Sequence, residues 1–457
     1  MMNLLLLTDS YKFTHWLQYP KKTTKVYSYF ESRGGEFDEI VFFGLQYYLK
    51  RYLEGQVVTR DKIDYAEERV NAHLPGRFNR AGWEYILDKY EGRLPIRIRA
   101  VPEGTVLPPH NVMMTVENTD PNCYWLTNYL ETLLVMTWYP STVATQSRSM
   151  KQSLLYYLNE TGGVAGIDFK LHDFGFRGST SVESAGIGGA AHLVNFKGTD
   201  TFQANEVLYE YYDEYMAGFS IPASEHSTIT SWGPDRECEA MRNMLVQYPD
   251  GLMACVSDSF DIMRACKSYW GGALKDMVLE RDGVLVVRPD SGYPPKIVCQ
   301  VLEALGDAFG TTENNEGYKV LHPKVRVIQG DGIDHEMLEI ILAHMKSNKW
   351  SAENIAFGSG GGLLQKVNRD TCKYAFKCSY AVVDKTEIEV YKDPVTDPGK
   401  KSKRGLLSLV RNGDGSWSTK GTSMLTDFEQ DELRTVFLNG EVREIDKLAA
   451  IRERAKC

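Results

Sequence analysis

Short apolar runs that each end in glycine, aspartate or arginine recur through the middle third of the sequence. Six of them have the length of a β-strand, and in order they read KLHDFGFRG (170–178), HLVNFKGTD (192–200), LMACVSDSFD (252–261), VLVVRPDSG (284–292), VRVIQGDG (325–332) and NIAFGSGGG (354–362). Most are followed by a segment with the apolar spacing of a helix. Repeated strand–loop–helix units predict a parallel α/β barrel, in which the residues at the carboxyl ends of the strands gather into one site.

The chain is too long, at 457 residues, for one compact core. We therefore predict an irregular parallel α/β barrel over residues 151–374. The remaining segments, 1–150 and 375–457, are expected to pack together as one mixed α+β domain into which the barrel is inserted.

Three local predictions concern the first segment. VYSYF (26–30) alternates like a strand, and PIRIRAVPEGTVLPP (95–109) has the pattern of a hairpin with Pro-Glu-Gly at its turn. The stretch 124–148 is almost entirely apolar and predicts one long helix in the core or at a subunit contact.

Composition excludes several classes of partner. A formal net charge of −9 repels nucleic acid and anionic membrane, and no apolar run reaches the roughly 20 residues that span a bilayer. The start, MMNLLLLTDSYK, lacks the basic region and cleavage site of a signal peptide. The eight cysteines show no CxxC or zinc spacing. We expect a cytoplasmic protein with reduced thiols.

Two glycine-rich stretches have different interpretations, one as a phosphate-binding loop and the other as a site of close packing. The loop 358–362 follows a strand and precedes a helix start, so its backbone N–H groups could approach a phosphate; the alternative is a tight turn. GIGGAA (186–191) fits the G-x-G-x-x-A spacing of dinucleotide-binding loops, but no strand precedes it. Close packing of small residues is the favoured account of that stretch.

Polar residues at three strand ends suggest a ligand rich in hydroxyls and phosphates. Arg288 and Asp290 end one run, and Asp258 and Asp331 end two others. Such residues suit a polyhydroxyl or Mg²⁺-phosphate ligand, although an Arg–Asp pair can also brace a turn. His226 lies in a Ser/Thr-rich loop between barrel units, where a lone histidine is more often structural than catalytic.

Long motifs make the sequence similar to the nicotinamide phosphoribosyltransferase family. The residues that carry the resemblance are TDSYKFTHW (8–16), YSYFESR (27–33), HDFGFRG (172–178), EHSTITSWG (225–233), RPDSG (288–292), VIQGDGID (327–334), IAFGSGGGLLQK (355–366) and KDPVTDP (392–398). The resemblance implies a type II phosphoribosyltransferase-like barrel packed with a mixed domain, and a homodimer with shared active sites.

The reaction that the resemblance implies is a step of NAD salvage. The 5-phosphoribosyl group passes from phosphoribosyl diphosphate to nicotinamide, giving nicotinamide mononucleotide and diphosphate. Mg²⁺ is the implied cofactor. ATP is the implied co-substrate, and its hydrolysis is coupled to product formation through a phosphohistidine at His226.

The resemblance also implies a role for individual residues. Phe174 and Tyr11 of the partner subunit would stack on the two faces of the base, and Asp200 would accept a hydrogen bond from its carboxamide. Arg177 and Arg288 would lie near the ring and the substrate anions. The implied ribose-phosphate contacts are Asp290, Gly330, Asp331, Gly360, Gly361 and Arg369. The implied diphosphate and ATP contacts are Asp9, Arg33, Arg177, Glu225, His226, Lys377, Lys392 and Lys400. The implied catalytic residues are His226, Asp290, Arg288 and Asp258.

Two alternatives remain at this point. A nicotinate phosphoribosyltransferase shares the reaction and the barrel, but it needs a neutral or cationic partner where Asp200 stands, because its base is an anion. A non-catalytic scaffold could share the fold as well. Against a scaffold, every implied catalytic position holds a competent residue.

Overall fold

The computed structural model describes residues 2–396 and 401–457, and its chain divides into two compact units. Unit 1 comprises the residues up to Thr145, Tyr209–Glu214 and Asn368–Lys456; unit 2 comprises Gln146–Leu208, Tyr215–Val367 and Cys457. Both ends of the chain therefore contribute to unit 1. The short segment Tyr209–Glu214 also belongs to it, which the sequence pattern did not indicate.

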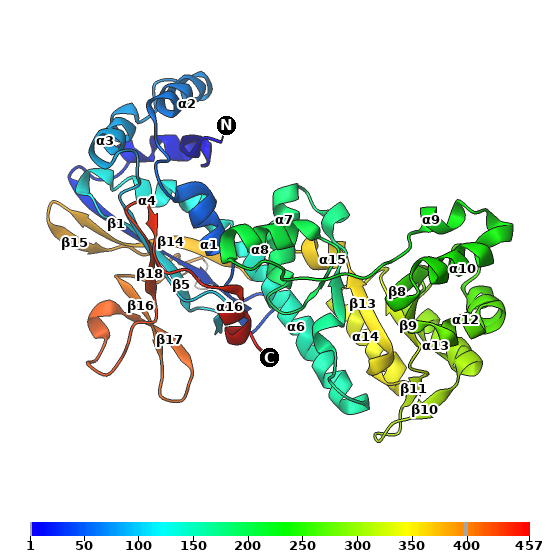
Figure 1. Cartoon of the computed structure of the whole chain (residues 1–457). Coiled ribbons are helices and arrows are strands. Elements are labelled where there is room, and N and C mark those ends of the chain that lie inside the picture. The colour runs from blue at the N-terminus through cyan, green and yellow to red at the C-terminus, as the bar shows by residue number, and fades with distance from the viewer. Residues whose placement is uncertain (1, 397–400) are drawn as a thin grey trace. The chain divides into compact units, whose positions relative to one another are not determined.

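Unit 2 contains a parallel sheet of six strands in the order β7-β6-β13-β12-β9-β8 (Figure 1). Each strand comes from one of the six apolar runs, so this part of the fold prediction is confirmed. The strands are β6 (Leu171–Asp173), β7 (Gly198–Thr199), β8 (Asp250–Val256), β9 (Asp282–Arg288), β12 (Val325–Gln329) and β13 (Ile355–Ser359).

A short irregular segment joins the two edges of this sheet. Phe219 pairs with Gly198 of β7, and Ala223 pairs with Ala254 of β8, in both cases in parallel. The N–H of Ala254 donates to the carbonyl of Pro222 at 2.9 Å. The sheet is therefore closed into an irregular parallel barrel, as the sequence predicts, but the closing segment was not foreseen.

Helices follow the strands and bury an apolar face. In α13, Pro294 and Pro295 start the helix, where the missing N–H groups need no partner, and Val298, Leu302 and Leu305 are buried. The longer helices of this unit are α7 (Val182–His192), α8 (Phe202–Tyr212, whose residues from Tyr209 on belong to unit 1), α10 (Glu237–Gln247), α13 (Pro294–Phe309) and α14 (His335–Ser347). Shorter helices are α9 (His226–Thr230), α11 (Ile262–Arg264), α12 (Lys275–Glu280) and α15 (Gly361–Leu364).

The glycines of the 186–191 stretch lie inside α7 and allow close helix packing. A side chain added at Gly189 would place its Cβ 2.8 Å from the Cβ of Ala204 in α8 and 3.0 Å from a carboxylate oxygen of Asp173. This finding confirms the packing account of the stretch, since α7 can approach its neighbours only without a side chain there.

Unit 1 is built on a seven-stranded sheet in the order β15-β14-β1-β5-β3-β18-β19. Strands from both ends of the chain alternate in it, and the predicted strand over 26–30 lies within β1. The bounds are β1 (Thr23–Ser32), β3 (Ile96–Ala100), β5 (Val112–Asn118), β14 (Tyr374–Val383), β15 (Thr386–Glu389), β18 (Arg434–Leu438) and β19 (Glu441–Val442). Outside this sheet, β16 (Leu407–Arg411) pairs with β17 (Trp417–Gly421), and the helices α2 (Arg60–His73), α3 (Arg80–Tyr90) and α16 (Leu448–Arg454) complete the unit.

The predicted hairpin over 95–109 is wrong. Strand β3 pairs with β5 and β18, whereas β4 (Val106–Leu107) pairs with β2 (Ile40–Val41). The turn between them buries Glu103 instead of exposing it. Local alternation identified both strands, but the choice of partner depends on residues distant in the sequence.

The predicted single helix over 124–148 is also wrong. It is divided into α4 (Leu126–Tyr129), α5 (Glu131–Val135) and α6 (Trp138–Thr161). Pro140 explains the last division, because a proline has no N–H and fits only the first turn of a helix. The helix α6 accordingly begins two residues before it.

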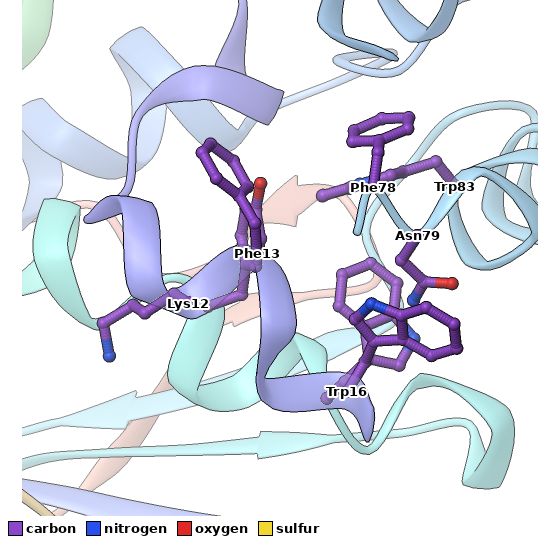
Figure 2. Close-up of a pocket in the computed structure, with 8 residues that line it drawn as sticks. Lys12, Phe13, Trp16, Phe78, Asn79 and Trp83 are labelled. Carbon is purple, nitrogen blue, oxygen red and sulfur yellow. The ribbon is translucent and has the colours of Figure 1, made fainter. Parts of the chain in front are cut away.

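An aromatic cluster in unit 1 anchors the helical turn Ser10–Leu17. Figure 2 shows Phe13 and Trp16 of this turn beside Phe78, Asn79 and Trp83. The ring of Trp83 lies edge-on to Tyr129 at 5.2 Å, and the cavity between these side chains is only about 10 Å³. The turn is thus firmly packed on one side, while Tyr11 on the same turn is 59% exposed.

The buried Glu103 makes the stability of unit 1 depend on pH. Its carboxylate accepts the N–H groups of Gly44 (3.1 Å) and Gln46 (2.6 Å) at the start of α1 (Leu45–Tyr48), and the hydroxyl of Tyr212 (2.9 Å). Burial is the largest cause that raises the pKa of Glu103, to about 7. The folded state therefore binds this proton more tightly than the unfolded chain does.

We expect this contribution to stability to be complete below the unfolded pKa of about 4.5 and to be lost as pH rises through 7. Between pH 5.5 and 8 the free energy of unfolding should fall by about 2 kcal/mol relative to Glu103→Gln, which cannot titrate. Urea unfolding of both proteins at the two pH values measures the difference. Equal changes in the two proteins would show that Glu103 is ionised throughout.

No disulfide joins any of the eight cysteines, all of which lie in the described ranges. Within those ranges, no helix combines the length and the apolar character needed to cross a bilayer.

Candidate active site

Alternate residues of the barrel strands point to the barrel interior. At its centre, Ala254 of β8, Val286 of β9 and Ile328 of β12 form one apolar cluster, and Phe174 packs against it just beyond the end of β6. Because side chains alternate along a strand, the next inward positions toward the carboxyl ends are Arg288 and Gly330. This end of the barrel therefore places an aromatic ring next to a guanidinium and an open backbone.

Two glycines make room for the ring of Phe174. A Cβ added at Gly358 would lie 1.9 Å from Cε2 of Phe174, and one added at Gly330 would lie 3.3 Å from the same atom. The ring also has a fixed backbone, since the N–H of Phe174 donates to the carbonyl of Ser359 at 2.9 Å. Glycine at position 358 is thus required by the aromatic ring above it.

Asp200 lies immediately after β7 and is tied to the end of β6. Its N–H donates to the carbonyl of Asp173 at 2.9 Å, and its carboxylate accepts a hydrogen bond from the hydroxyl of Ser220. The carboxylate is exposed, unlike that of Asp173. Nearby, burial lowers the pKa of His172, so that an uncharged imidazole lies beside this carboxylate.

His226 lies between two carboxylates at the start of α9. Its Nε2 is 3.0 Å from Oδ1 of Asp258, and its Nδ1 is 3.9 Å from Oδ2 of Asp290. The hydroxyl of Ser291 donates to the other oxygen of Asp258 at 2.5 Å. The imidazole is 46% exposed, whereas the side chain of Asp258 is 4% exposed. A carboxylate held in this way orients an accessible ring.

The charged residues at the ends of β9 and β12 are close to the same cluster. Nη2 of Arg288 is 3.3 Å from Oδ2 of Asp290, while its buried Nε has no partner among the described residues. A Cβ at Gly330 would be 3.6 Å from Oδ1 of Asp290. The side chain of Gln329 donates to the carbonyl of Asp331 at 3.1 Å and braces that loop. Gly330 therefore lies between Phe174 and Asp290.

The glycine-rich loop forms the N-terminal end of α15. No atom lies within 4 Å of a Cβ added at Gly361, so this backbone faces open space. A Cβ at Gly362 would instead lie 2.4 Å from the carbonyl oxygen of Ile333. The loop is therefore open on one side and tightly packed on the other.

Unit 2 thus carries most of the predicted site residues at the carboxyl ends of the barrel strands or in the loops that follow them. Glu225 caps the helix that begins at His226, with its N–H 3.3 Å from the hydroxyl of Thr228. Arg177 is exposed on the turn that follows Phe174. The predicted site residues of unit 2 are Phe174, Arg177, Asp200, Glu225, His226, Asp258, Arg288, Asp290, Gly330, Asp331, Gly360 and Gly361.

Unit 1 carries a separate group of predicted cations. Burial is the largest cause that lowers the pKa of Lys377, and the charges of Arg33, Arg369 and Lys392 lower it further, against the opposing effect of Glu131. Nε of Arg33 is 2.9 Å from a carboxylate oxygen of Glu31, and its buried Nη2 has no partner within the described part of the chain. These four cations form a patch suited to anions. Lys400 lies outside the described residues.

Two further predicted residues belong to unit 1. Asp9 accepts a hydrogen bond from the hydroxyl of Thr132 at 2.8 Å, and Tyr11 is exposed two residues later. The neighbouring Lys12 is held by Glu131 at 2.7 Å. The turn therefore presents an aromatic ring on a fixed backbone.

The barrel interior also contains a cavity of about 470 Å³ that sequence reasoning missed. Its walls include His172, Ile328 and Ala356, and two cations, Lys170 and Arg326, line it toward the amino ends of the strands. Burial lowers the pKa of Lys170 to about 8, although its Nζ donates to the carbonyls of Glu353 (2.8 Å) and Ile355 (2.9 Å). The alternation that places Phe174 inward would have placed His172 and Lys170 on the same face.

Two family models match this chain. The model of the nicotinate phosphoribosyltransferase (NAPRTase) family matches residues 169–441, and that of the nicotinamide phosphoribosyltransferase N-terminal domain matches residues 3–98. In structure, the chain is similar to nicotinate-nucleotide pyrophosphorylase from Pyrococcus furiosus, with a TM-score of 0.63, 16% identity and coverage of 100% of this chain and 96% of that one. The fold and the family model define a phosphoribosyltransferase.

Proteins similar in sequence indicate which kind of phosphoribosyltransferase this is. A nicotinamide phosphoribosyltransferase from Xanthomonas campestris pv. campestris (strain 8004) is 50% identical over 450 residues, covering 96% of this chain and 95% of the relative. One from Acinetobacter baylyi (strain ATCC 33305 / BD413 / ADP1) is 34% identical over 494 residues, covering 99% and 97%. The chain is an enzyme that belongs to the nicotinamide phosphoribosyltransferase family.

Proposed function

We propose that this enzyme transfers the 5-phosphoribosyl group from phosphoribosyl diphosphate to nicotinamide, forming nicotinamide mononucleotide and diphosphate for NAD salvage. One observation carries the proposal: Phe174, Gly330, Asp290, His226 and Asp258 follow one another around the carboxyl end of the barrel, and Asp200 is hydrogen-bonded to Asp173, the residue before Phe174. An aromatic ring and a carboxylate at one side, and a cluster of polar groups at the other, suit a flat amide base and a phosphorylated sugar.

In the proposed step the ring nitrogen of nicotinamide attacks C1 of the ribose with its lone pair, and the bond from C1 to the diphosphate oxygen breaks. The electron pair of that bond leaves with the diphosphate, so no proton has to be removed and no general base is needed. Catalysis then rests on alignment of the two substrates and on stabilisation of the departing anion. The enzyme must chiefly position the two substrates and neutralise the charge of the departing diphosphate.

The base is proposed to lie against Phe174 with its carboxamide toward Asp200. A carboxylate accepts the amide N–H and repels the carboxylate of nicotinate, which favours nicotinamide over the alternative base. Arg177 and Arg288 are proposed near the ring and the anions. The proposed ribose-phosphate contacts are Asp290, Gly330, Asp331, Gly360, Gly361 and Arg369.

For the diphosphate we propose the cation patch of unit 1, with Lys400 and Asp9 as further contacts. The carboxylates that flank His226, those of Asp258 and Asp290, would supply oxygen ligands for Mg²⁺, although the described residues hold no ready cluster of three or more metal-binding side chains. A hard cation that keeps several waters and binds through phosphates suits such a site. When bound, it would neutralise charge on the leaving group.

We also propose that the enzyme is a homodimer in which Tyr11 of the partner subunit covers the second face of the base. The exposure of Tyr11 on a firmly packed turn supports this, because it leaves the ring accessible to a second subunit. Light scattering should find a dimer. A fully active monomer would exclude the shared site.

ATP is proposed as co-substrate: an imidazole nitrogen of His226 attacks the terminal phosphorus, the bond to the β-phosphate oxygen breaks, and ADP leaves with the electron pair of that bond. The accessible imidazole held by Asp258 supports the proposal, since a carboxylate on one nitrogen orients the other toward a phosphoryl group. We expect ATP to leave an acid-labile phosphate on the protein and to raise turnover. Both effects should be absent from His226→Ala.

The matched control is His335→Ala, which changes another histidine that begins a helix and lies 3.7 Å from a carboxylate, that of Glu339. It should keep the phosphorylation and the stimulation. Stimulation by ATP that survives in His226→Ala would contradict the assignment.

Incubation with phosphoribosyl diphosphate, nicotinamide and Mg²⁺, followed by mass detection of the mononucleotide, tests the function itself. Product formation is expected. Its absence at every pH would favour a non-catalytic scaffold on the same fold.

A further inference from the structure

Asp173 is a buried carboxylate that the proposed chemistry does not use. It ends β6, is fully buried, and its side chain points away from the barrel interior because its neighbours His172 and Phe174 point inward. Burial raises its pKa to about 6. A carboxylate costs free energy in such a place, so its role calls for an explanation.

The contacts of Asp173 connect both residues proposed to recognise the base. Oδ1 accepts the N–H of Gly175 at 2.7 Å and so closes the turn that carries Phe174. The backbone carbonyl of Asp173 accepts the N–H of Asp200 at 2.9 Å. In the parallel sheet, Asp173 pairs with Ser359 on one side and Thr199 on the other.

Two glycines make room for the carboxylate of Asp173. A Cβ at Gly189 of α7 would lie 3.0 Å from Oδ2, and one at Gly175 would lie 3.0 Å from Oδ1. The carboxylate is buried, and the hydroxyls of Thr201 and Thr199 lie near enough to oppose the rise in its pKa that burial causes. A side chain confined in this way transmits its position to the turn it caps.

We propose that Asp173 is a positioning residue whose side chain fixes the turn that carries Phe174 and thereby sets the affinity for the pyridine base. The inference rests on the proposed function. It predicts that the KM for the base rises selectively, since the proposed ribose-phosphate contacts lie after β9, β12 and β13 and in unit 1.

Steady-state kinetics of Asp173→Ala and Asp173→Asn test it. The alanine variant loses the acceptor for Gly175, and we expect the KM for nicotinamide to rise about tenfold, with the KM for phosphoribosyl diphosphate unchanged within about twofold. Asparagine keeps an acceptor of the same shape and should restore most of the affinity. If the alanine variant does not fold, Asp173→Val, which has a similar volume but no acceptor for the N–H of Gly175, must show the same selective rise.

Asp168→Ala is the matched control. Asp168 precedes the amino end of the same strand and holds Lys151 and Lys197 at 3.0 and 2.9 Å. Its loss should lower the Tm and leave both KM values unchanged. An unchanged KM for nicotinamide in Asp173→Ala, or an equal rise for both substrates, would overturn the inference. A wild-type enzyme that forms no mononucleotide would instead refute the proposed function.

Discussion

Replacement of Asp200 by serine is expected to lower kcat/KM for nicotinamide about 100-fold and to shift the preference toward nicotinate. A hydrogen bond to a charged group contributes roughly 1.5–3 kcal/mol, and each 1.4 kcal/mol is a factor of ten. The carboxylate also repels the anionic base, so its removal relieves a penalty on nicotinate at the same time. Steady-state kinetics with both bases measure the two effects together.

The position of Asp200 makes this variant informative. Its N–H is fixed by the carbonyl of Asp173 and its carboxylate by the hydroxyl of Ser220, so serine removes the charge with the backbone in place. Asp282→Ser, which changes an exposed aspartate at the amino end of β9, is the control and should leave the preference as it is. An unaltered preference in Asp200→Ser would remove Asp200 from base selection.

A methyl group at position 358 should lower the rate almost as much as the replacement of Asp200. The added Cβ of Gly358→Ala would lie 1.9 Å from the ring of Phe174, so the ring has to move by more than 1 Å. A displacement of that size at a site that aligns substrates costs about 100-fold in rate. The fold should survive, because Phe174 is only partly buried and can turn aside.

A double-mutant cycle separates this steric effect from general disturbance. In a Phe174→Leu background the methyl group should cost much less than in the wild type, since the clashing ring is gone. Gly163→Ala, where the nearest atom would be 3.6 Å away, is expected to be neutral. Equal costs in both backgrounds would mean that Gly358 acts through something other than Phe174.

The sequence alone predicted the barrel well because its strands are short, apolar and followed by helices. The six runs supplied all six strands of the sheet, and the alternation within each run settles which residues face inward. The closing segment was missed, since it makes only single bridges to its neighbours and contains Pro222, which reads as a loop. Its Ser220 contact to Asp200 was missed with it.

The structure of unit 1 was harder to predict, because its strands pair with partners that are distant in the sequence. The hairpin over 95–109 failed because β3 and β4 take partners far along the chain. The cation patch illustrates the same limit: Lys377 pairs in register with Tyr29 of β1, more than 340 residues earlier, which places it near Arg33. Only the family resemblance, not spacing or periodicity, indicated that these residues act together.

A competition experiment tests the central claim most directly. The purified enzyme receives equal concentrations of nicotinamide and nicotinate with phosphoribosyl diphosphate and Mg²⁺, and mass spectrometry measures the ratio of the two mononucleotides. We predict that nicotinamide mononucleotide predominates by at least about 100-fold, the size expected of one carboxylate that both binds an amide and repels an anion. A predominance of nicotinate mononucleotide, or the absence of both products, would contradict the account.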